Sequence, residues 1–498
     1  MKYIGAIDHG TTSTRFIVFN EMGRIIGSSQ LEHKQHFPKP GWVEHDPCEI
    51  RDNTFQVIRK TLADANLTYK DISAVGITNQ RETVLAWNLQ NGKIYHNAIV
   101  WQDLRGSELI EKIRKKYSED KIKRLSGLVL SPYFSASKIS WLLKNVKGLR
   151  TAVNNGEAVI GTMDSYLMWC LTGNRRIITD VTNASRYMLM NIKTLKWDPE
   201  LLEIFDIPAK AMPEIVPSIG RIYDYTRPDG PFGGEVPLAG ILGDQQSALF
   251  GQACFTKGSG KCTYGTGCFF LMNTGENLCY SGKGLLTTVA YMIDGQKPLY
   301  ALEGSIAVAG SLIQWLRDNL KLIESAPQSD YYAEQVEDCG GVYIVPAFAG
   351  LFAPYWRSDA RGVIAGLTGF SNKNHICRAA LESTAFQVND ILKAIESDSK
   401  IKLSLLKVDG GLTNSRLLMK FQADILGIPV VKPVITETTA LGCAYAAGIS
   451  TGVFSGLEEL NTRWEGSERY ECSMDKKERN SKVLFWKKAV ERTLNWTV

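Results

Sequence analysis

The first polar turn of the chain combines groups that could hold a polyphosphate and a metal ion. Residues 8–13 read Asp-His-Gly-Thr-Thr-Ser and stand between two apolar runs, with Arg15 two residues further on. Backbone N–H groups in the turn and the guanidinium of Arg15 suit phosphate oxygens, and the carboxylate of Asp8 suits the water shell of Mg²⁺. An ordinary polar hairpin turn is the alternative interpretation of this segment alone.

A second turn of the same kind occurs in the second half of the chain. Gly265-Thr266-Gly267 separates residues 260–264 from residues 268–273, and its glycines allow a phosphate to approach the backbone closely. Because each half has such a turn, we predict that the two loops bind one triphosphate between them. The chain has neither the G-x-x-x-x-G-K-[ST] motif nor a G-x-G-x-x-G that opens a helix after its first strand, which disfavours P-loop and dinucleotide chemistry.

Two further groups of polar residues follow apolar runs. Asp244 comes directly after residues 239–243 and before Gln245, a position from which a general base can be presented. A helix N-cap explains an aspartate after glycine equally well. Arg81 and Glu82 end the run 74–80, and a pair of adjacent opposite charges at a strand end is more often a surface ion pair than a site.

The elements that must position these residues follow a repeated plan. The first three apolar runs are separated by short turns, which predicts an antiparallel meander: residues 2–7, 15–20 and 24–29. Residues 260–264, 268–273 and 285–291 repeat this arrangement of strands. The repetition predicts a duplicated architecture with a boundary near residue 252.

Apolar residues at three- and four-residue steps predict helices over residues 137–144 and 199–205. A third helix is predicted over 305–323, with Ser305 as its N-cap. Gly310 interrupts that segment at a cost of about 1 kcal/mol relative to alanine, which indicates a packing or ligand reason for the glycine.

Composition excludes several classes of protein. The 498 residues are enough for two domains, and 44% hydrophobic with 22% charged residues is typical of a globular chain. Lys+Arg 57 against Asp+Glu 52, without a long run of like charge, gives no footprint for nucleic acid. Ten scattered cysteines without a C-x-x-C pair, and no signal-peptide or membrane-spanning run, predict reduced thiols and a cytoplasmic protein.

Nine segments spread over most of the chain carry a resemblance to one family. The motifs resemble those of the FGGY carbohydrate kinase family, and most closely those of its members that phosphorylate glycerol. The segments are 7–13, 40–46, 76–83, 97–103, 264–269, 301–305 and 408–411, together with the two broader family signatures over 133–145 and 362–382.

The resemblance implies an α/β fold of two actin-like (ribonuclease-H-like) ATPase domains with a central inter-domain cleft. Residues 1–252 would form the N-terminal FGGY kinase domain, with the polyol site and the first phosphate loop. Residues 253–498 would form the C-terminal domain, with the second phosphate loop and the nucleotide site. The implied activity is transfer of the γ-phosphate of ATP to glycerol with Mg²⁺, giving sn-glycerol 3-phosphate and ADP, in a homo-oligomeric (dimeric or tetrameric) enzyme.

The resemblance also implies roles for individual residues. Asp244 would be the catalytic base, accepting the proton of the attacking hydroxyl, and Asp8 would orient Mg²⁺ through water. The glycerol-binding residues would be Arg81, Glu82, Trp101, Tyr133, Asp244, Gln245 and Phe269. The ATP-binding residues would be Thr11, Thr12, Ser13, Arg15, Thr266, Gly310, Gln314, Gly411, Asn414 and Ser415.

Three positions depart from the family pattern. His9 replaces the usual Gln or Glu; we interpret it as a spectator that could add a pH dependence near neutrality. Asn414 stands one place earlier than in many relatives, which leaves open whether it or Ser415 contacts the nucleotide. Glu235 replaces the arginine of relatives that respond to fructose 1,6-bisphosphate, and we expect that anion to have little influence.

Three other functions stay open at this level. One is a kinase for a ketose or pentitol, such as xylulose, in place of glycerol. Another is an actin-like, ATP-driven assembly or chaperone protein, because a shared fold does not prove a shared function. The third is an inactive kinase, which only the unusual His9 favours.

Overall fold

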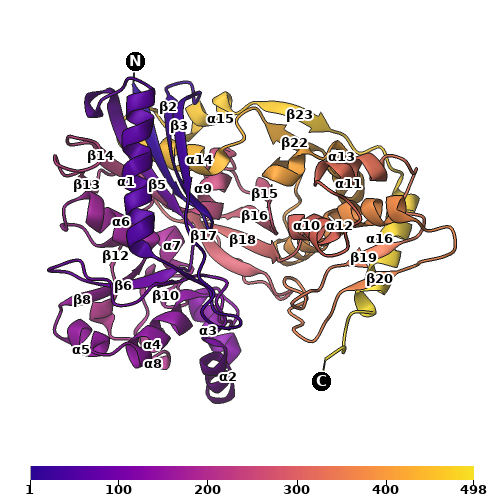
Figure 1. The fold of residues 1–498 in the computed structure, drawn as a ribbon, viewed down its shortest axis with the longest axis horizontal. Coiled ribbons are helices and arrows are strands. Elements are labelled where there is room, and N and C mark those ends of the chain that lie inside the picture. Colours follow the sequence, from indigo (N-terminus) through magenta and orange to yellow (C-terminus); the bar gives the residue numbers. More distant parts are fainter. Residues whose placement is uncertain (1, 498) are drawn as a thin grey trace.

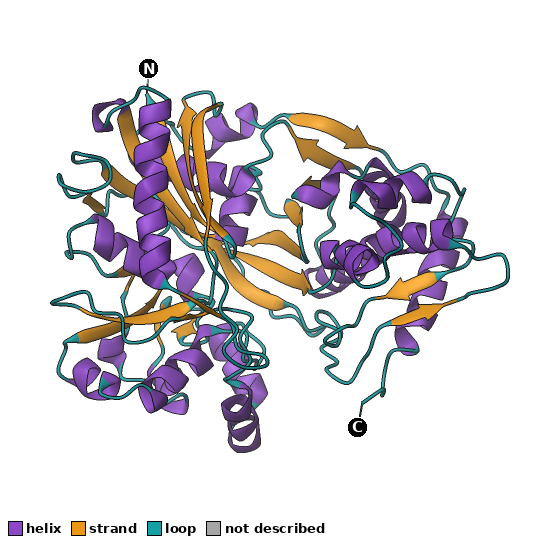
Figure 2. Cartoon of the chain, in the orientation of Figure 1, coloured by secondary structure: helices purple, strands orange, loops and turns teal. Residues whose placement is uncertain are grey.

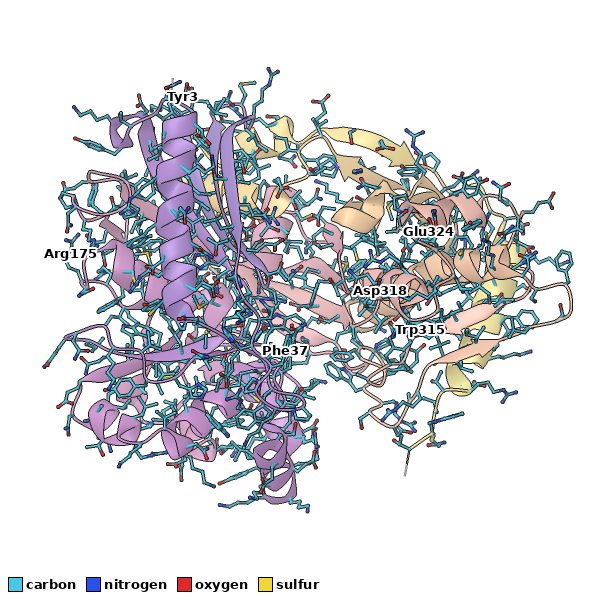
Figure 3. All side chains as sticks on the ribbon, in the orientation of Figure 1. Tyr3, Phe37, Arg175, Trp315, Asp318 and Glu324 are labelled. Carbon is cyan, nitrogen blue, oxygen red and sulfur yellow. The ribbon has the colours of Figure 1, made fainter. Side chains whose placement is uncertain are left out.

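The structure is a computed structural model that describes residues 2–497. It has two halves, each built on a mixed sheet with helices packed against it (Figures 1 and 2). The N-terminal sheet has the strand order β13-β14-β5-β1-β2-β3, and the C-terminal sheet has the order β17-β18-β16-β15-β21-β22-β23. Tyr3 and Trp315 lie in opposite halves of the molecule (Figure 3).

The N-terminal sheet begins with the predicted meander. β1 pairs antiparallel with β2, which pairs antiparallel with β3, and β1 pairs parallel with β5 on its other side. The strands are β1 (Tyr3–His9), β2 (Ser13–Asn20), β3 (Ile25–Glu32), β5 (Ile72–Asn79), β13 (Asp224–Tyr225) and β14 (Pro237–Gly243). Asp8 is opposite Arg15 in this register, so the first polar turn lies at one end of the sheet.

Alternation along the strands divides the N-terminal core into two layers. Ile7 and Val18 pack with helix α1 (Pro47–Asp64), whereas Ala6 and Ile17 pack with helix α14 (Thr438–Ser450). Successive side chains of a strand point to opposite faces, so these helices cover opposite faces of the sheet. A smaller sheet lies below in Figure 1, with β4 (Glu44–His45), β6 (Val84–Asn88), β7 (Ala98–Ile99) and β8 (Ala158–Thr162).

The C-terminal sheet differs from the predicted repeat. β15 and β16 form the expected hairpin, but β16 pairs with β18, and residues 285–291 supply the outer strand β17. The strands are β15 (Gly260–Tyr264), β16 (Cys268–Gly275), β17 (Leu286–Tyr291), β18 (Leu299–Ile306), β21 (Leu406–Asp409), β22 (Val430–Pro433) and β23 (Gly466–Tyr470). The turn after β17 returns the chain as an antiparallel partner, which inserts β18 between β17 and β16.

The predicted helix start at Ser305 is wrong. Ser305 belongs to β18, and helix α10 begins only at Gly310 (Gly310–Asp318). Residues 300–306 are buried on both faces, so their apolar run imitates the start of a buried helix. The predicted packing reason for Gly310 is confirmed, because a Cβ there would lie 2.7 Å from the carbonyl oxygen of Gly265.

The helices predicted over 137–144 and 199–205 are confirmed as α4 (Ser135–Asn145) and α8 (Pro199–Ile204). Four further helices are α9 (Asp244–Gly251), α12 (Lys373–Ser399), α13 (Arg416–Leu426) and α16 (Lys476–Glu491).

Helices α9 and α14 join the two halves at the centre of the molecule (Figure 1). A Cβ on Gly442 of α14 would lie 1.8 Å from the carbonyl oxygen of Ser247 on α9. A Cβ on Gly76 of β5 would likewise lie 2.0 Å from the carbonyl oxygen of Cys443. Glycine therefore permits the backbone of α14, a C-terminal element, to lie directly on the N-terminal sheet.

All ten cysteines have free thiols, as predicted, and most of them are buried. Within residues 2–497, no helix is both long and apolar enough to cross a membrane.

Candidate active site

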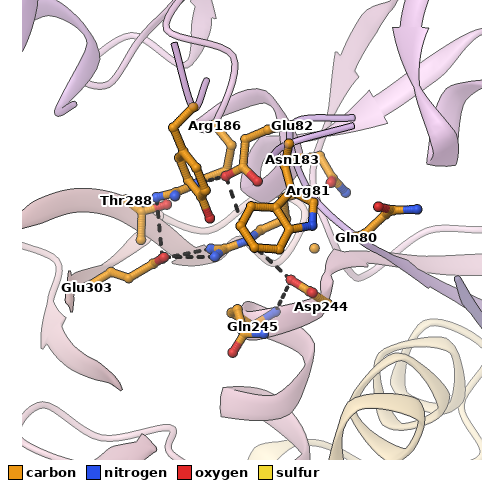
Figure 4. A network of polar contacts seen from close by, with 12 residues as sticks. Gln80, Arg81, Glu82, Asn183, Arg186, Asp244, Gln245, Thr288 and Glu303 are labelled. Atoms are coloured by element: carbon orange, nitrogen blue, oxygen red, sulfur yellow. Dashed lines mark hydrogen bonds and ion pairs between the residues drawn. The ribbon is translucent and has the colours of Figure 1, made fainter. Parts of the chain in front are cut away.

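A buried network of four charges lies where the two sheets meet (Figure 4). Glu303 accepts two hydrogen bonds from Arg81, at 2.7 and 2.8 Å, and lies 3.3 Å from Arg186. Arg186 donates from Nε to Glu82 at 2.6 Å. The side chains of Arg81 and Glu82 are only 2% exposed. The pair is therefore not a surface ion pair.

Sequence reasoning missed Arg186 and Glu303 as members of this network. Glu303 comes from β18 in the C-terminal sheet, and Arg186 follows α7 (Val181–Ala184) in the N-terminal half. Neither has a local motif that marks it as a site residue. Complete burial of a charged side chain requires partners, but the sequence does not reveal which residues are buried together.

Asp244 presents a carboxylate beside this network. It is the first residue of α9, and Gly243 is the N-cap, so the N-cap interpretation is wrong. Its Oδ1 lies 3.2 Å from Nε of Arg81, and its side chain is 27% exposed. Burial raises the pKa of Asp244, although Arg81 and Lys261 oppose the shift. A partly accessible carboxylate with a raised pKa can accept a proton from a hydroxyl within hydrogen-bond distance of it.

Lys261 is a third site residue that was not predicted from the sequence. It lies on β15, is fully buried, and donates to Oε1 of Gln245 at 2.6 Å and to Thr263 at 2.7 Å. Because Lys261 engages the amide oxygen, the NH₂ group of Gln245 is left to donate to a ligand. A lysine inside the apolar run 260–264 was the available signal, since buried lysines need a specific partner.

Three aromatic side chains form an apolar wall close to the charges. The rings of Trp101 and Tyr133 are 5.6 Å apart and those of Trp101 and Phe269 are 6.4 Å apart, both edge to face. Arg186 lies 5.8 Å from the ring of Tyr133. The structure therefore brings together all seven residues expected to bind glycerol, from both halves of the chain.

The aromatic wall is connected to the first phosphate loop. Nε1 of Trp101 donates to the hydroxyl of Thr11 at 3.0 Å, and the loop closes through a bond from Gly10 N–H to the Ser13 carbonyl at 2.9 Å. Thr12 is exposed, whereas Ser13 is buried at the start of β2. The polyol-binding and phosphate-binding residues expected from the sequence are thus neighbours.

Asp8 and Arg15 stand at the base of this loop. Asp8 is almost fully buried, and burial raises its pKa to about 6, despite the opposing effect of Arg15. Arg15 forms an ion pair with Glu437 at 2.6 Å, just before α14. A buried carboxylate beside a phosphate loop fits an Mg²⁺ ion that is held mainly by phosphate oxygens and water. Within residues 2–497, no group of three or more His, Cys, Asp or Glu that could hold a metal ion occurs.

His9 does not titrate near neutrality, which agrees with its interpretation as a spectator and argues against the pH dependence that it could have added. The ring is 1% exposed, and its Nε2 lies 2.7 Å from the hydroxyl of Thr54. Burial, with a smaller effect of the nearby His33, lowers the pKa of His9 to about 3. The ring therefore stays neutral and fills space behind the loop.

The second phosphate loop rests on the start of α10. The carbonyl of Thr266 accepts from Ala309 N–H at 3.0 Å and Ser311 N–H at 3.1 Å, and Gly310 N–H donates to Gly265 at 3.1 Å. Gln314 is exposed one turn further along α10. Thr266, Gly310 and Gln314 are thus neighbours at the start of α10.

Residues 411–415 lie at the end of β21. Gly411 opens a short 3₁₀ helix (Gly411–Asn414), and Ser415 caps α13. The hydroxyl of Ser415 donates to Asp330 and accepts from Leu418 N–H, whereas Asn414 is exposed and its Oδ1 accepts from Lys432 at 2.9 Å. Asn414 is therefore the more accessible of the two for a nucleotide.

Comparison with known proteins identifies the family to which this chain belongs. Residues 3–251 match the N-terminal domain of the FGGY family of carbohydrate kinases, and residues 260–451 match its C-terminal domain. The chain belongs to this family, and its two-domain α/β fold agrees with the fold expected from the resemblance.

Individual relatives point to one branch of the family. A glycerol kinase of Pseudarthrobacter chlorophenolicus is 53% identical, covering 99% of this chain and 98% of the relative. A glycerol kinase of Carboxydothermus hydrogenoformans is 52% identical, covering 100% and 99%. The crystal structure of Plasmodium falciparum glycerol kinase with ADP superposes with a TM-score of 0.93 at 40% identity, covering 99% and 98%. A xylulose kinase of Lactobacillus acidophilus, at 21% identity and a TM-score of 0.86, shares the fold.

Proposed function

We propose that this protein transfers the γ-phosphate of ATP to a terminal hydroxyl of glycerol, forming sn-glycerol 3-phosphate and ADP. The observation that best supports this proposal is the similarity to glycerol kinases over essentially the whole chain, at 53% identity. The site agrees with such a substrate, because a triol needs several convergent polar groups and apolar walls for its C–H faces.

Asp244 would act as the base in this reaction. The hydroxyl oxygen attacks the γ-phosphorus, its proton passes to the carboxylate of Asp244, and the bond from the γ-phosphorus to the β–γ bridging oxygen breaks with ADP as the leaving group. The ion pair with Arg81, at 3.2 Å, orients Asp244 and limits the rise of its pKa. The ionised carboxylate is the form that can accept the proton of the hydroxyl, and the positive charge of Arg81 favours that form.

The polar groups around Asp244 would fix the orientation of the acceptor. The NH₂ group of Gln245 donates to a hydroxyl oxygen, because Lys261 occupies its carbonyl oxygen. Arg81 and Glu82 bind further hydroxyls, while Trp101 and Phe269 cover the carbon chain. A site built from such bonds rejects analogues that lack a hydroxyl, because its buried polar groups would be left without partners.

Phosphate and metal contacts would come from the two loops. The amides and hydroxyls of residues 11–13 and Thr266 bind phosphate oxygens, and Arg15 adds a positive charge. Asp8 would hold Mg²⁺ through water, and the ion would neutralise charge on the phosphates. Gly310, Gln314, Gly411 and Asn414 would line the nucleotide. Residues 1–252 and 253–498 would be the two domains that close around these ligands.

We also propose that the protein is a cytoplasmic homo-oligomer. Ten free thiols, most of them buried, suit a reducing compartment. Size-exclusion chromatography with light scattering would distinguish a dimer or tetramer from a monomer.

The test is a coupled ADP-release assay with Mg-ATP and a panel of acceptors: glycerol, dihydroxyacetone, xylulose, ribitol and none. We expect turnover with glycerol that Asp244→Asn abolishes. The matched control is Asp64→Asn, an exposed aspartate at the end of α1, which should leave turnover unchanged. Preference for xylulose or ribitol would favour the ketose or pentitol kinase. ADP release without any acceptor would favour an actin-like ATPase.

A further inference from the structure

A large cavity with a basic lining lies in the C-terminal half, apart from the residues of the candidate active site. We call it the basic groove; it is formed by α12, α13 and α16 with the loops 282–284 and 354–356. Figure 1 shows these three helices together in the C-terminal half. The volume of about 920 Å³ lies within the usual range for ligand pockets, roughly 300–1,000 Å³.

The charge of the lining is strongly unbalanced. Its positive residues are Lys283, Lys393, Lys476, Arg479 and Lys487, and Asp390 is its one carboxylate. Asp390 is already bound, because it accepts from the hydroxyl of Tyr355 at 2.8 Å and from Nε1 of Trp486 at 2.7 Å. The groove therefore presents five cations to a ligand, against one carboxylate whose Oδ2 already accepts two hydrogen bonds.

Most of these cations have no anionic partner. Within residues 2–497, no carboxylate lies within ion-pair distance of four of them, which are Lys283, Lys476, Arg479 and Lys487. The guanidinium of Arg479 is fixed by the carbonyls of Asp424, at 2.6 Å, and Met474, at 3.2 Å. A cation held rigidly by neutral groups is well placed to bind a phosphate.

The sequence of α16 arranges these charges along one face. Lys476, Arg479, Val483 and Lys487 follow at three- and four-residue steps, so they form one stripe of the helix beside the groove. The stripe is roughly 16 Å long at 1.5 Å per residue. Lys477 and Lys488 directly follow Lys476 and Lys487 in the sequence but do not line the groove, so they serve as controls for charge on the same helix.

The opposite wall is aromatic and polar. Trp356 packs against hydrophobic cores of both halves, and its φ of 49° is rare for a bulky residue. Nε1 of Trp356 donates to the carbonyl of Gly284 in the facing loop. Asn389 is 2% exposed, and its Oδ1 has no hydrogen-bond partner within residues 2–497. Buried polar atoms without partners are rare, and this one lies in the lining of the groove.

We propose that the basic groove binds a small organic phosphate, with its phosphate at the cations of α16 and its apolar body against Trp356. The stripe supplies charge-assisted hydrogen bonds, and the ring supplies apolar contact. The unpartnered Oδ1 of Asn389 accepts a hydrogen bond from a donor group of the ligand. This site would be separate from the phosphate loops, because none of the residues of those loops lines the groove.

The test is equilibrium binding to the full-length protein by calorimetry, with phenyl phosphate, inorganic phosphate and phenol as probes. We expect saturable binding of phenyl phosphate, weaker binding of inorganic phosphate and no binding of phenol. Lys476→Gln with Lys487→Gln should weaken the affinity for phenyl phosphate about tenfold, from two lost charge-assisted contacts. Trp356→Ala should abolish the advantage of phenyl phosphate over inorganic phosphate.

The matched control is Lys477→Gln with Lys488→Gln, which removes the same charge from the same helix outside the groove. We expect it to change the affinity by less than about twofold, as for exposed charges. Equal losses in the two double variants, or no saturable binding by the unmodified protein, would overturn the proposal. Because the comparison of variants localises the site, the result does not depend on whether the protein phosphorylates glycerol.

Discussion

The sharpest prediction concerns Glu303, the carboxylate that holds two guanidinium groups in the buried network. Glu303→Gln preserves the shape of the side chain and removes its negative charge. Burial alone would raise the pKa of Glu303, but Arg186 and Arg81 lower it from 4.5 to about 2. At 1.36 kcal/mol per unit, that shift corresponds to a loss of about 3 kcal/mol on neutralisation. Removing one partner of a buried ion pair typically costs about 3–5 kcal/mol, which agrees with this value.

We therefore expect the free energy of unfolding of Glu303→Gln to fall by about 3 kcal/mol, measured by urea denaturation. The kcat/KM for glycerol should fall as well, because Arg81 loses the bonds that hold it at 2.7 and 2.8 Å. The KM for ATP should change little, since Glu303 does not contact either phosphate loop. Glu324→Gln, at an exposed position, is the matched control.

A double-mutant cycle with Arg186→Met tests the reasoning further. The double variant should lose less stability than the sum of the single variants, because Arg186 is then no longer left without its partner. A Glu303→Gln protein within about 0.5 kcal/mol of the unmodified chain, the range of ordinary surface substitutions, would refute the account of the network. Strict additivity in the cycle would refute it equally.

Four further predictions concern single residues of the site. Asp8 has a raised pKa of about 6 in the folded chain, so the affinity for Mg-ATP should fall as the pH drops below 6. In a binding titration, Asp8→Asn should bind Mg-ATP weakly at every pH. The same variant should unfold less readily at pH 7, because it removes a buried charge. The pKa of His9 is lowered to about 3 in the folded chain, so the protein should lose stability as the pH falls below 6.5, the pKa of histidine in the unfolded chain. His9→Gln should therefore make urea unfolding less sensitive to pH between 4 and 6. The same variant should leave the pH profile of kcat between 6.5 and 8 unchanged. Lys261→Met should raise the KM for glycerol more than it lowers kcat, because the amide of Gln245 is then free to rotate; equal KM values would contradict this role. Asn414→Ala should raise the KM for ATP, whereas Ser415→Ala should mainly lower thermal stability by about 1 kcal/mol through the lost helix cap.

The elements that could be predicted from the sequence are those determined by local pattern. The meander of β1, β2 and β3 follows from short apolar runs and polar turns, and α4 follows from its helical spacing. Both phosphate turns are visible for the same reason. The strand β18 escapes prediction because a strand buried on both faces has no alternating pattern, and Ser305 then resembles a helix cap.

The site was only partly predictable because its buried charges come from distant parts of the chain. Arg81 and Glu303 are 222 residues apart, and Glu82 and Arg186 are 104 residues apart. No local spacing encodes such pairs, so only resemblance to a family assigned roles to Arg81 and Glu82. His9 illustrates a second limit, because its pKa depends on burial against Thr54 and not on its neighbours in the sequence.

The most direct test of the proposed activity is to follow the products by ³¹P NMR after mixing the purified protein with Mg-ATP and glycerol. We expect one phosphomonoester for each ADP formed, with the monoester identified as sn-glycerol 3-phosphate. Formation of ADP with inorganic phosphate and no monoester would contradict it.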